Sequence, residues 1–386
     1  MDERLRFVAR LLEGEEMSAL CREFGISRKT GYKIWSRYKD LGLEALTDRS
    51  RRPIRYGNQL PVQVEAMIVA CKRDKPHWDA RKIRELLVRR LPHAVRVPVN
   101  STIHAVLDRH GLVNRKGKRR GRAQGTPLSH GLKPNDLWCT DYKGEFLLGN
   151  KKYCYPLTVT DHASRHLLLC EAMESTRQDL AFRAFERLFR ERGLPAAIRS
   201  DNGVPFASAH ALFNLSRLAV WWLRLGIAIE RITPGQPQQN GRHERMHLTL
   251  KKEATRPPGM NILQQQATFD AFVQEFNHER PHEALDMKCP ADIYKPAGRQ
   301  YRGLPELEYP LHDREAVVTH CGRLCLHRKK INISKVFSGQ KLGIREVDDA
   351  IWLVSFMHYD LGYVDLEEKI LQPIDNPFNK ILLPMS

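Results

Sequence analysis

Apolar residues in the first third of the chain recur at the spacing of amphipathic helices. One such helical face is formed by Leu5, Val8, Leu11 and Leu12. The same spacing predicts helices over residues 17–24, 62–72 and 80–91, and then a helix over 102–110 with Ser101 as its N-cap. Two small all-helical domains are therefore expected, at residues 1–48 and 58–114.

From residue 136 onward the pattern changes to short β-prone runs that alternate with amphipathic helices. Three runs at 137–146, 152–160 and 165–172, separated by turn residues, predict an antiparallel meander. The elements expected after them are a helix over 176–191, strands over 196–200 and 226–231, and helices over 238–254 and 263–277. This order predicts an α/β domain at residues 136–298, with helices on the faces of a mixed sheet.

After residue 300 short alternating segments return at regular spacing, with Gly and Asp turns between them. The expected strands are 315–319, 323–327, 341–345, 350–356 and 363–366. Short, evenly spaced strands of this kind are typical of small barrels. The chain is therefore predicted to be multidomain, with a small all-β barrel at residues 310–374.

One segment of the front part has the chemistry of a helix-turn-helix. Within residues 17–35, Gly25 provides the turn, Ile26 fills the core between two helices, and Ser27 is placed to cap the second helix. The side chains that this second helix would present to a DNA major groove are Arg28, Lys29, Thr30, Tyr32 and Lys33. The alternative is an ordinary helical hairpin with a solvated basic face.

The distribution of charge favours the DNA-binding interpretation. The net charge is +18, and residues 1–130 hold 29 Lys and Arg against 14 Asp and Glu. An excess concentrated in one third of the chain favours a polyanionic partner, here double-stranded DNA. Two basic stretches add to it: an arm with Arg49, Arg51 and Arg52, and a linker at residues 115–135 with Arg115, Lys116, Lys118, Arg119 and Arg120. The linker is expected to lie along DNA phosphates. The arm could also bind along DNA, or it could be only an exposed connection between domains.

Composition also bears on where the protein works. Eight cysteines occur singly, without C-x-x-C pairs, and no run of about 18 apolar residues appears. The first residues lack the apolar stretch of a secretory signal. We expect a cytoplasmic, nucleoid-associated protein with reduced thiols and no membrane partner.

Three acidic residues stand at places where strands and helices begin or end. Asp141 ends a β-prone run, Asp201 lies where a short strand breaks into an Asn-Gly turn, and Glu244 opens a helix after a Pro- and Gly-rich cluster. Carboxylates from two strand ends and one helix can converge, and their oxygens suit hard cations such as Mg²⁺. The spacing permits this arrangement, but each acid could instead be a turn or cap carboxylate.

Around these acids the sequence resembles the DDE group of insertion-sequence transposases and retroviral integrases, whose catalytic core is RNase H-like. The matching motifs are Trp138-x-x-Asp141, Leu157-Thr158-Val159-Thr160-Asp161-x-x-Ser164-Arg165, Ser200-Asp201-Asn202-Gly203-x-x-Phe206, Pro234-Gly235-x-Pro237-x-x-Asn240-Gly241-x-x-Glu244 and Phe276-Asn277-x-x-Arg280-Pro281-His282-x-x-Leu285. They cover about half of the chain. One departure is the 43-position separation of Asp201 from Glu244, which is longer than usual in the family and predicts a lengthened helix or an insertion within 207–225.

The resemblance implies roles for individual residues. Asp141, Asp201 and Glu244 would be the catalytic residues and would bind two Mg²⁺ (or Mn²⁺) ions per active site. Asn240 and Lys251, which share a helical face with Glu244, would contact the DNA substrate.

The resemblance extends to the flanking domains. The segment from Trp78 to Ile83 is similar to the start of a second helix-turn-helix, with Asp79 as the cap, so Arg81 and Lys82 would also bind DNA. The C-terminal barrel would be of the SH3-like kind.

Together these observations predict a transposase or integrase of an insertion element. It would bind the element ends, cleave at their 3′ ends and transfer the strands into target DNA, as a homo-oligomer assembled on DNA and without a nucleotide cofactor. The alternatives are a DNA-binding regulator or catalytically inactive relative, and an RNase H-like nuclease that cuts without joining.

Overall fold

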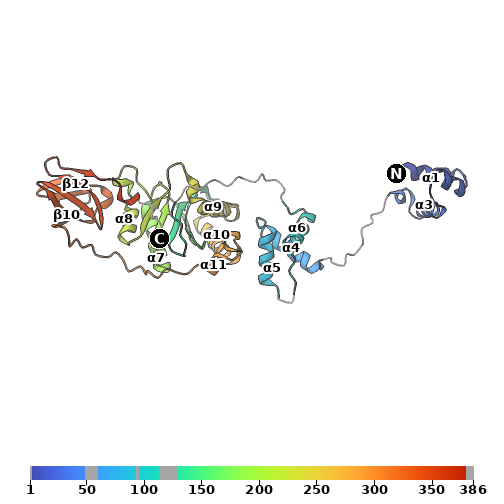
Figure 1. Ribbon diagram of the computed structural model, residues 1–386, viewed down its shortest axis with the longest axis horizontal. Coiled ribbons are helices and arrows are strands. Elements are labelled where there is room, and N and C mark those ends of the chain that lie inside the picture. The colour runs from blue at the N-terminus through green and yellow to red at the C-terminus, as the bar shows by residue number, and fades with distance from the viewer. Residues whose placement is uncertain (1, 48–59, 93–94, 114–127, 380–386) are drawn as a thin grey trace. The chain divides into compact units, whose positions relative to one another are not determined.

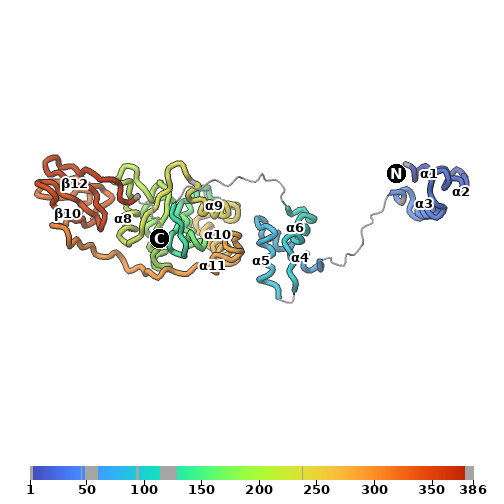
Figure 2. The backbone as a smooth tube through the Cα atoms, viewed as in Figure 1, coloured from blue at the N-terminus to red at the C-terminus, as the bar shows by residue number. Residues whose placement is uncertain are grey.

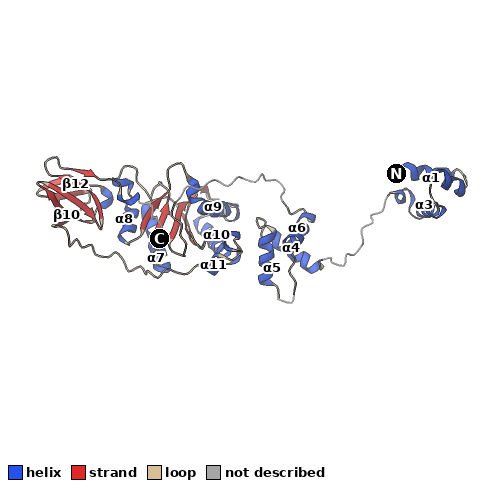
Figure 3. Cartoon of the chain, in the orientation of Figure 1, coloured by secondary structure: helices blue, strands red, loops and turns tan. Residues whose placement is uncertain are grey.

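The computed structural model describes residues 2–47, 60–92, 95–113 and 128–379. The chain divides into two compact units, Met1–Val64 and Glu65–Ser386. In the described part of the first 113 residues all regular structure is helical, and strands occur only in the later part (Figure 3). None of the helices in the described ranges is both long enough and apolar enough to cross a membrane.

The N-terminal unit contains the predicted helix-turn-helix. Its helices are α1 (Asp2–Leu12), α2 (Met17–Glu23) and α3 (Arg28–Leu41) (Figure 1). Gly25 makes the turn with φ of 61°, which favours glycine. The Ser27 hydroxyl accepts a hydrogen bond from the Thr30 amide at 3.2 Å, so the predicted N-cap of α3 is confirmed.

The close contact of α2 with α3 depends on Gly31. This glycine is buried, and a Cβ built on it would lie 2.5 Å from Cys21 Sγ and 3.1 Å from the Phe7 ring. The small core beneath it is formed by Phe7, Val8, Leu20, Cys21 and Leu46. One face of α3 is thus committed to packing and the other is left for solvent or a partner.

A second group of helices follows: α4 (Val62–Asp74), which crosses the boundary between the units, α5 (Ala80–Arg90) and α6 (Asn100–Arg109). Asp79 caps α5, because its Oδ1 accepts from the Lys82 amide at 3.0 Å, as predicted. The predicted cap at Ser101 is wrong. Helix α6 begins two residues earlier than predicted, with Val99 at the N-cap position and no side-chain hydrogen bond, so Ser101 lies within its first turn.

The α/β core is built on a mixed sheet whose strands β4, β3, β1, β5 and β6 lie side by side in that order. Pairs β4–β3 and β3–β1 are antiparallel, and pairs β1–β5 and β5–β6 are parallel. The strands are β1 (Leu137–Tyr142), β2 (Phe146–Leu147), β3 (Tyr153–Asp161), β4 (Leu167–Met173), β5 (Ala197–Ser200) and β6 (Ala228–Arg231). The predicted meander is confirmed, but its first strand is divided into β1 and the two-residue β2.

Helices cover the two faces of this sheet. Helix α7 (Gln178–Arg192) packs on one face against Trp138, Leu157 and Val159. On the other face, α9 (Gly241–Glu253) and α10 (Ile262–Gln274) lie side by side and share a cluster with Leu167 and Cys170 (Figure 2). Because side chains alternate along a strand, the face under α9 also receives Cys139, Asp141, Thr158 and Thr160.

The segment between β5 and β6 contains no lengthened helix. It is a loop with a short 3-10 turn (Leu212–Asn214), followed by the eight-residue α8 (Arg217–Arg224). Of the two alternatives for the long Asp201–Glu244 separation, the lengthened helix is therefore wrong. Ser216 caps α8 by accepting from the Ala219 amide at 3.1 Å.

The C-terminal region forms a seven-stranded sheet in the order β7-β10-β11-β12-β13-β9-β8, and the two edge strands lie close together, so the barrel is nearly closed. Its strands are β7 (Arg314–Val317), β8 (Arg323–Leu326), β9 (Lys329–Asn332), β10 (Lys341–Asp348), β11 (Ile351–Phe356), β12 (Tyr359–Asp365) and β13 (Ile370–Pro373). Strands β9 and β13 were not predicted. The barrel is confirmed as a small all-β domain, and its SH3-like type stays a prediction.

Helix α8 belongs to two hydrophobic cores at once. Leu218 and Trp222 pack into the α/β core, whereas Ala219, Val220 and Leu223 pack into the core of the barrel. Since both faces of this helix are buried, α8 is one element through which the barrel is attached to the α/β core.

Candidate active site

Asp141 lies at the end of central strand β1, on the sheet face covered by α9. It is paired in register with Thr158 of β3, and directly opposed residues of paired strands share a face. The Asp141 side chain is 25% exposed. The strand end therefore presents a partly buried carboxylate beside helix α9.

Asp201 and Glu244 reach the same region from other elements. Asp201 follows directly after β5, the strand parallel to β1, and its Oδ1 accepts from the Gly203 amide at 3.1 Å. Glu244 lies in the first turn of α9, where the helix dipole favours an anion. Burial raises the pKa of both carboxyl groups.

Electrostatics connect the three acids. Burial, and after it the negative charge of Asp201 and that of Glu244, raise the pKa of Asp141 to about 7. Of these causes, the negative charges of Asp201 and Glu244 are the ones that would also stabilise a cation beside Asp141. The structure thus brings the three predicted acids within electrostatic reach of one another.

The donor set fits a hard divalent cation. All three side chains offer carboxylate oxygens, which Mg²⁺ and Mn²⁺ prefer. In the conformation observed, no three His, Cys, Asp or Glu side chains within the described ranges are close enough together to hold one ion. Sharing an ion therefore requires the carboxylates to draw inward, a movement that attraction to the cation favours.

A buried network of two histidines and two threonines holds α9 on the sheet beside Asp141. Thr158 Oγ1 lies 2.8 Å from His243 Nε2 and 2.7 Å from His247 Nε2, and Thr160 Oγ1 lies 2.7 Å from His243 Nδ1. Burial lowers the pKa of His243 to about 3 and that of His247 well below its usual value. Both rings are therefore neutral at physiological pH.

The position of each proton determines which atoms of this network donate hydrogen bonds and which accept them. The Thr158 hydroxyl is 3.0 Å from the Asp141 carbonyl oxygen, which can only accept, so the hydroxyl donates there. Both histidines then donate Nε2–H to Thr158, which leaves each Nδ1 as an acceptor. His243 Nδ1 accepts from Thr160, and His247 Nδ1 faces the Asp141 carboxylate at 3.9 Å.

Two lysines supply positive charge at the mouth of the site. Lys143 follows β1, and burial together with the charge of Lys251 lowers its pKa, whereas Asp141 raises it. Lys251 is exposed on α9, as its predicted contact with DNA requires. Asn240 is only 4% exposed and its Oδ1 has no described partner, so in this structure it offers little surface to DNA, and its contact with DNA stays a prediction.

The sequence predicts the three acids as site residues but not the residues around them. It assigns no role to Lys143, His243 or His247, and Thr158 stands only within a matching motif. The available signal was the spacing of His243 and His247, four positions apart on the helix that bears Glu244. Nothing in the sequence indicated that both would meet one threonine of β3.

The predicted DNA-contacting residues outside the core have different surroundings. Arg28, Lys29, Thr30, Tyr32 and Lys33 are all exposed on α3. Arg81 forms an ion pair with Glu283, and Lys82 lines a cavity beside α9. The other predicted basic residues lie outside the described ranges: Arg49, Arg51, Arg52, Arg115, Lys116, Lys118, Arg119 and Arg120.

Comparison with protein families gives matches along most of the chain. Two Integrase core domain models match, over residues 131–237 and 225–290. A Helix-turn-helix domain model matches residues 3–54, and a Homeodomain-like domain model matches residues 30–107.

The curated relatives come from bacterial insertion elements. The "Insertion element IS407 uncharacterized 31.7 kDa protein" of Burkholderia multivorans is 26% identical over 231 residues, covering 59% of this chain and 79% of the relative. The "Insertion element IS476 uncharacterized 39.2 kDa protein" of Xanthomonas euvesicatoria is 24% identical over 233 residues. That match covers 60% of this chain and 64% of the relative, slightly under two thirds.

Solved structures that are similar include retroviral integrases. A simian T-cell lymphotropic virus intasome in complex with PP2A regulatory subunit B56 gamma is 14% identical at a TM-score of 0.38, covering 76% of this chain and 97% of that one. The HTLV-2 integrase catalytic core in complex with magnesium (trimeric form) is 16% identical at a TM-score of 0.34, covering 43% of this chain and all of that one. From its family matches and curated relatives, the chain has an integrase core domain at residues 131–290, preceded by helix-turn-helix domains, and is a homologue of insertion-element proteins.

Proposed function

We propose that this protein is the transposase of an insertion element, which binds the element ends, cleaves at their 3′ ends and joins them to target DNA. The observation that supports the proposal is that the negative charges of Asp201 and Glu244 both act on the partly buried carboxyl of Asp141 within an integrase core. The parallel neighbours β1 and β5 deliver the two aspartates, and the first turn of α9 delivers the glutamate.

The chemistry is transesterification at phosphorus. In cleavage the oxygen of water forms the new bond to phosphorus, in joining the 3′-hydroxyl oxygen does, and in both the bond to the leaving oxygen breaks. Mg²⁺ or Mn²⁺ bound by the three carboxylates, two ions per site, would supply Lewis-acid stabilisation of the charge that builds up on the phosphate. No nucleotide cofactor and no covalent enzyme intermediate are required.

The remaining residues of the site position its parts. The hydroxyl of Thr158, with His243 and His247, fixes α9 against β3 and thereby the place of Glu244 relative to Asp141. Lys143 and Lys251 provide cations for the DNA phosphates next to the reacting one. The exposed face of α3 binds the element end, and two ends held together imply an oligomer assembled on DNA.

The test is a joining assay with the full chain, pre-cleaved end DNA of the element that carries the gene, a supercoiled target and Mg²⁺ or Mn²⁺. The variant Asp201→Asn removes one charge of the site and should lower joining by roughly a hundredfold or more, with end binding unchanged. The matched control is Glu191→Gln, an exposed α7 carboxylate without a described partner, which should join normally.

The outcomes separate the competing functions. Joined products from the Asp201→Asn variant would overturn the assignment of the site. Cleavage of uncut ends by the wild-type protein without joining would indicate a nuclease. Tight end binding with neither product would indicate a DNA-binding regulator or an inactive relative.

A further inference from the structure

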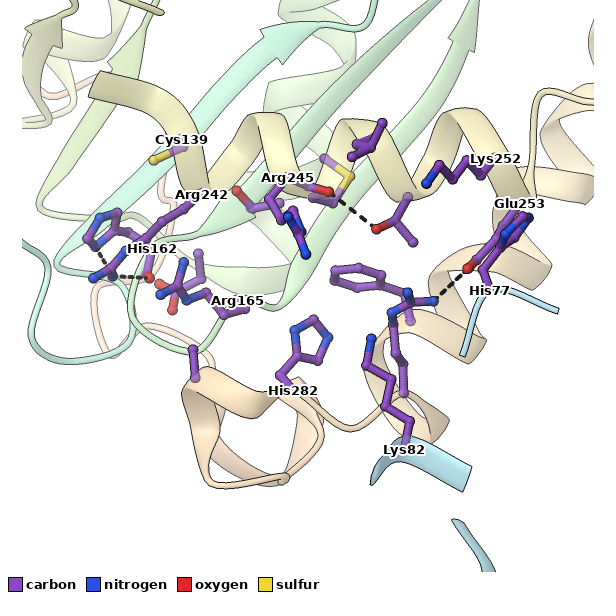
Figure 4. A pocket seen from close by; sticks show the side chains of 18 of the residues that line it. His77, Lys82, Cys139, His162, Arg165, Arg242, Arg245, Lys252, Glu253 and His282 are labelled. Atoms are coloured by element: carbon purple, nitrogen blue, oxygen red, sulfur yellow. Dashed lines mark hydrogen bonds and ion pairs between the residues drawn. The ribbon is translucent and has the colours of Figure 1, made fainter. Parts of the chain in front are cut away.

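A basic cavity of about 680 Å³ lies beside helix α9, between that helix, the turn before β4 and the segment after α10 (Figure 4). We call it the α9 pocket. Its basic lining consists of Lys82, Arg165, Arg242, Arg245, Lys252 and Arg280. Figure 4 shows Arg242 and Arg245 extending below α9 and Lys252 alongside the helix, with Arg165 and His282 lying below them.

The α9 pocket is distinct from the carboxylate site. Successive residues of a helix are turned by about 100°, so Arg242, Arg245, Thr249 and Lys252 form one flank of α9. Glu244 and Lys251 form another flank, turned by about 130° from the first. On the side of α9 that faces the sheet, the buried side chains separate these two flanks. On the opposite side, the solvent-exposed surface of the helix lies between them.

The acids that line the pocket are already engaged. Asp161 accepts hydrogen bonds from the Ser164 amide and hydroxyl and from the Asn135 amide. Both oxygens of Glu253 lie 2.8 Å from Arg280 Nη1, in a largely buried ion pair. Asp79 caps α5. These carboxylates therefore leave most of the pocket's cations without a counter-charge.

Four cations of the pocket are free to bind a ligand. Within the described ranges the side chains of Lys82, Arg165, Arg245 and Lys252 have no hydrogen bond or ion pair. The buried Nε of Arg165 is an unpartnered donor, and this residue is held at φ of 64°, a conformation that side-chain-bearing residues rarely adopt. Burial and the charge of Arg242 lower the pKa of Arg165 to about 10, and burial and the charge of Arg280 lower that of Lys82.

We propose that the α9 pocket binds the phosphodiester backbone of a DNA strand that crosses the exposed face of α9. Crowded cations with an orphaned guanidinium donor match phosphate oxygens, which accept several hydrogen bonds. The row from Arg242 to Lys252 is about 15 Å long at 1.5 Å per residue. Measured along the axis of a duplex, where the phosphates of one strand recur about every 3.4 Å, that length spans about four phosphates. A polymer therefore fits it better than a single free anion does.

The inference rests on the proposed function and extends it. DNA held at Lys251 on one flank and at the pocket on the other would be fixed on both sides of the carboxylates. The pocket would thus be a positioning site for DNA, separate from the residues that perform the chemistry.

The experiment measures binding of a 40-base-pair duplex by the full chain as salt is varied. In the double variant Arg245→Gln/Lys252→Gln, the slope of log affinity against log salt should fall by about 0.9 for each phosphate that the variant can no longer neutralise, or about 1.8 in total. The matched control is Arg183→Gln/Arg190→Gln, which removes two exposed arginines from α7 on the opposite sheet face and should leave the slope unchanged. Thermal unfolding checks that each variant is folded, and Lys252→Gln alone replaces the double variant if that one is not.

Each result decides the matter. If the double variant has the wild-type slope, the proposal that the α9 pocket binds DNA is overturned. If the wild-type protein still joins DNA, the proposed function stands without this pocket. If the slope is reduced in the double variant but the wild-type protein never joins DNA, DNA binding by the pocket is supported and the proposed function is overturned. A third outcome is that inorganic phosphate raises the unfolding temperature of the wild-type protein more than chloride does at equal ionic strength, but not that of the double variant, while the DNA slope is unchanged. This result would assign the pocket to a free anion and overturn the DNA proposal.

Discussion

The hydroxyl group of Thr158 connects strand β1, strand β3 and helix α9. It donates to the Asp141 carbonyl oxygen and accepts from His243 and His247. Thr158→Val keeps the shape of the side chain but leaves three buried polar groups without a partner, so we expect a loss of about 1–3 kcal/mol in the free energy of unfolding. Urea unfolding measures it.

The same variant tests whether Thr158 positions the site. If the network fixes Glu244, joining by Thr158→Val should show a reduced kcat with DNA affinity unchanged, at a temperature well below its unfolding midpoint. Thr158→Ser retains the hydroxyl and should restore both stability and kcat. A valine variant that is as stable and as active as the wild-type protein would rule the network out as a positioning device.

At this scale the sequence indicated the acids but not their environment. Asp141, Asp201 and Glu244 stand in motifs with a fixed local pattern, so a single chain suffices to predict them. The pKa of Asp141 depends on burial and on charges 60 and 103 positions further along the chain. Those relations exist only once the sheet has formed, and no local pattern contains them.

Among the elements, α3 shows how a single position determines a helix contact. A side chain at Gly31 would overlap Cys21 and Met17 of α2 and Phe7 of α1. Gly31→Leu should gain about 0.5–1 kcal/mol in helix propensity but lose more through overpacking, typically 1–3 kcal/mol. We expect a lower unfolding midpoint for the N-terminal unit and weaker binding to duplex DNA.

The control for this prediction lies on the same helix. Lys29→Ala changes an exposed side chain of α3 and should leave the unfolding midpoint unchanged, although it removes a positive charge from the DNA-facing surface. If Gly31→Leu unfolds at the same temperature as the wild-type protein, α2 and α3 are not held together at this residue.

Cap chemistry explains why some element boundaries were predictable and others were not. Ser27 and Asp79 each precede their helix and accept from the third residue after them, which a single sequence reveals. At α6 the local signal pointed to Ser101, yet the helix begins at Asn100. Strands β9 and β13 each contain a single buried residue among four, so neither shows the alternation of buried and exposed positions seen in the equally short β8.

For the whole molecule, buried neutral histidines predict sensitivity to acid. The pKa values of His162, His166, His243, His247 and His282 are all lowered, first of all by burial. Below pH 6.5 the unfolded chain takes up protons that the folded protein does not, so stability falls as the pH falls. Each histidine should cost about 1 kcal/mol between pH 6.5 and 5.5.

The carboxyl groups oppose this effect but do not cancel it. Asp141, with its pKa raised to about 7, makes the folded protein more stable as the pH falls through 7. Burial also raises the pKa of Asp161, Asp201 and Glu244, so four carboxyl groups oppose the five histidines. We therefore expect the unfolding midpoint, measured in EDTA, to fall between pH 7.5 and pH 5.5.

His166→Phe tests the cause of the acid sensitivity. The ring at this position stacks on Tyr294 with centroids 4.4 Å apart, and phenylalanine keeps that contact without a titrating group. The decline in stability over the same pH range should become shallower by about 1 kcal/mol. An unchanged decline would show that His166 is not held neutral in the folded protein.

Helix α8, which packs into both the α/β core and the barrel, has a consequence for how the gene can be shortened. A protein ending before the barrel would leave Ala219, Val220 and Leu223 uncovered, together with the neighbouring Leu215. An apolar strip on a fragment of this kind promotes self-association rather than a free catalytic core. Frameshifts or internal stop codons in the last quarter of the gene should therefore yield insoluble products. The α/β core and the barrel are expected to be retained together in related genes.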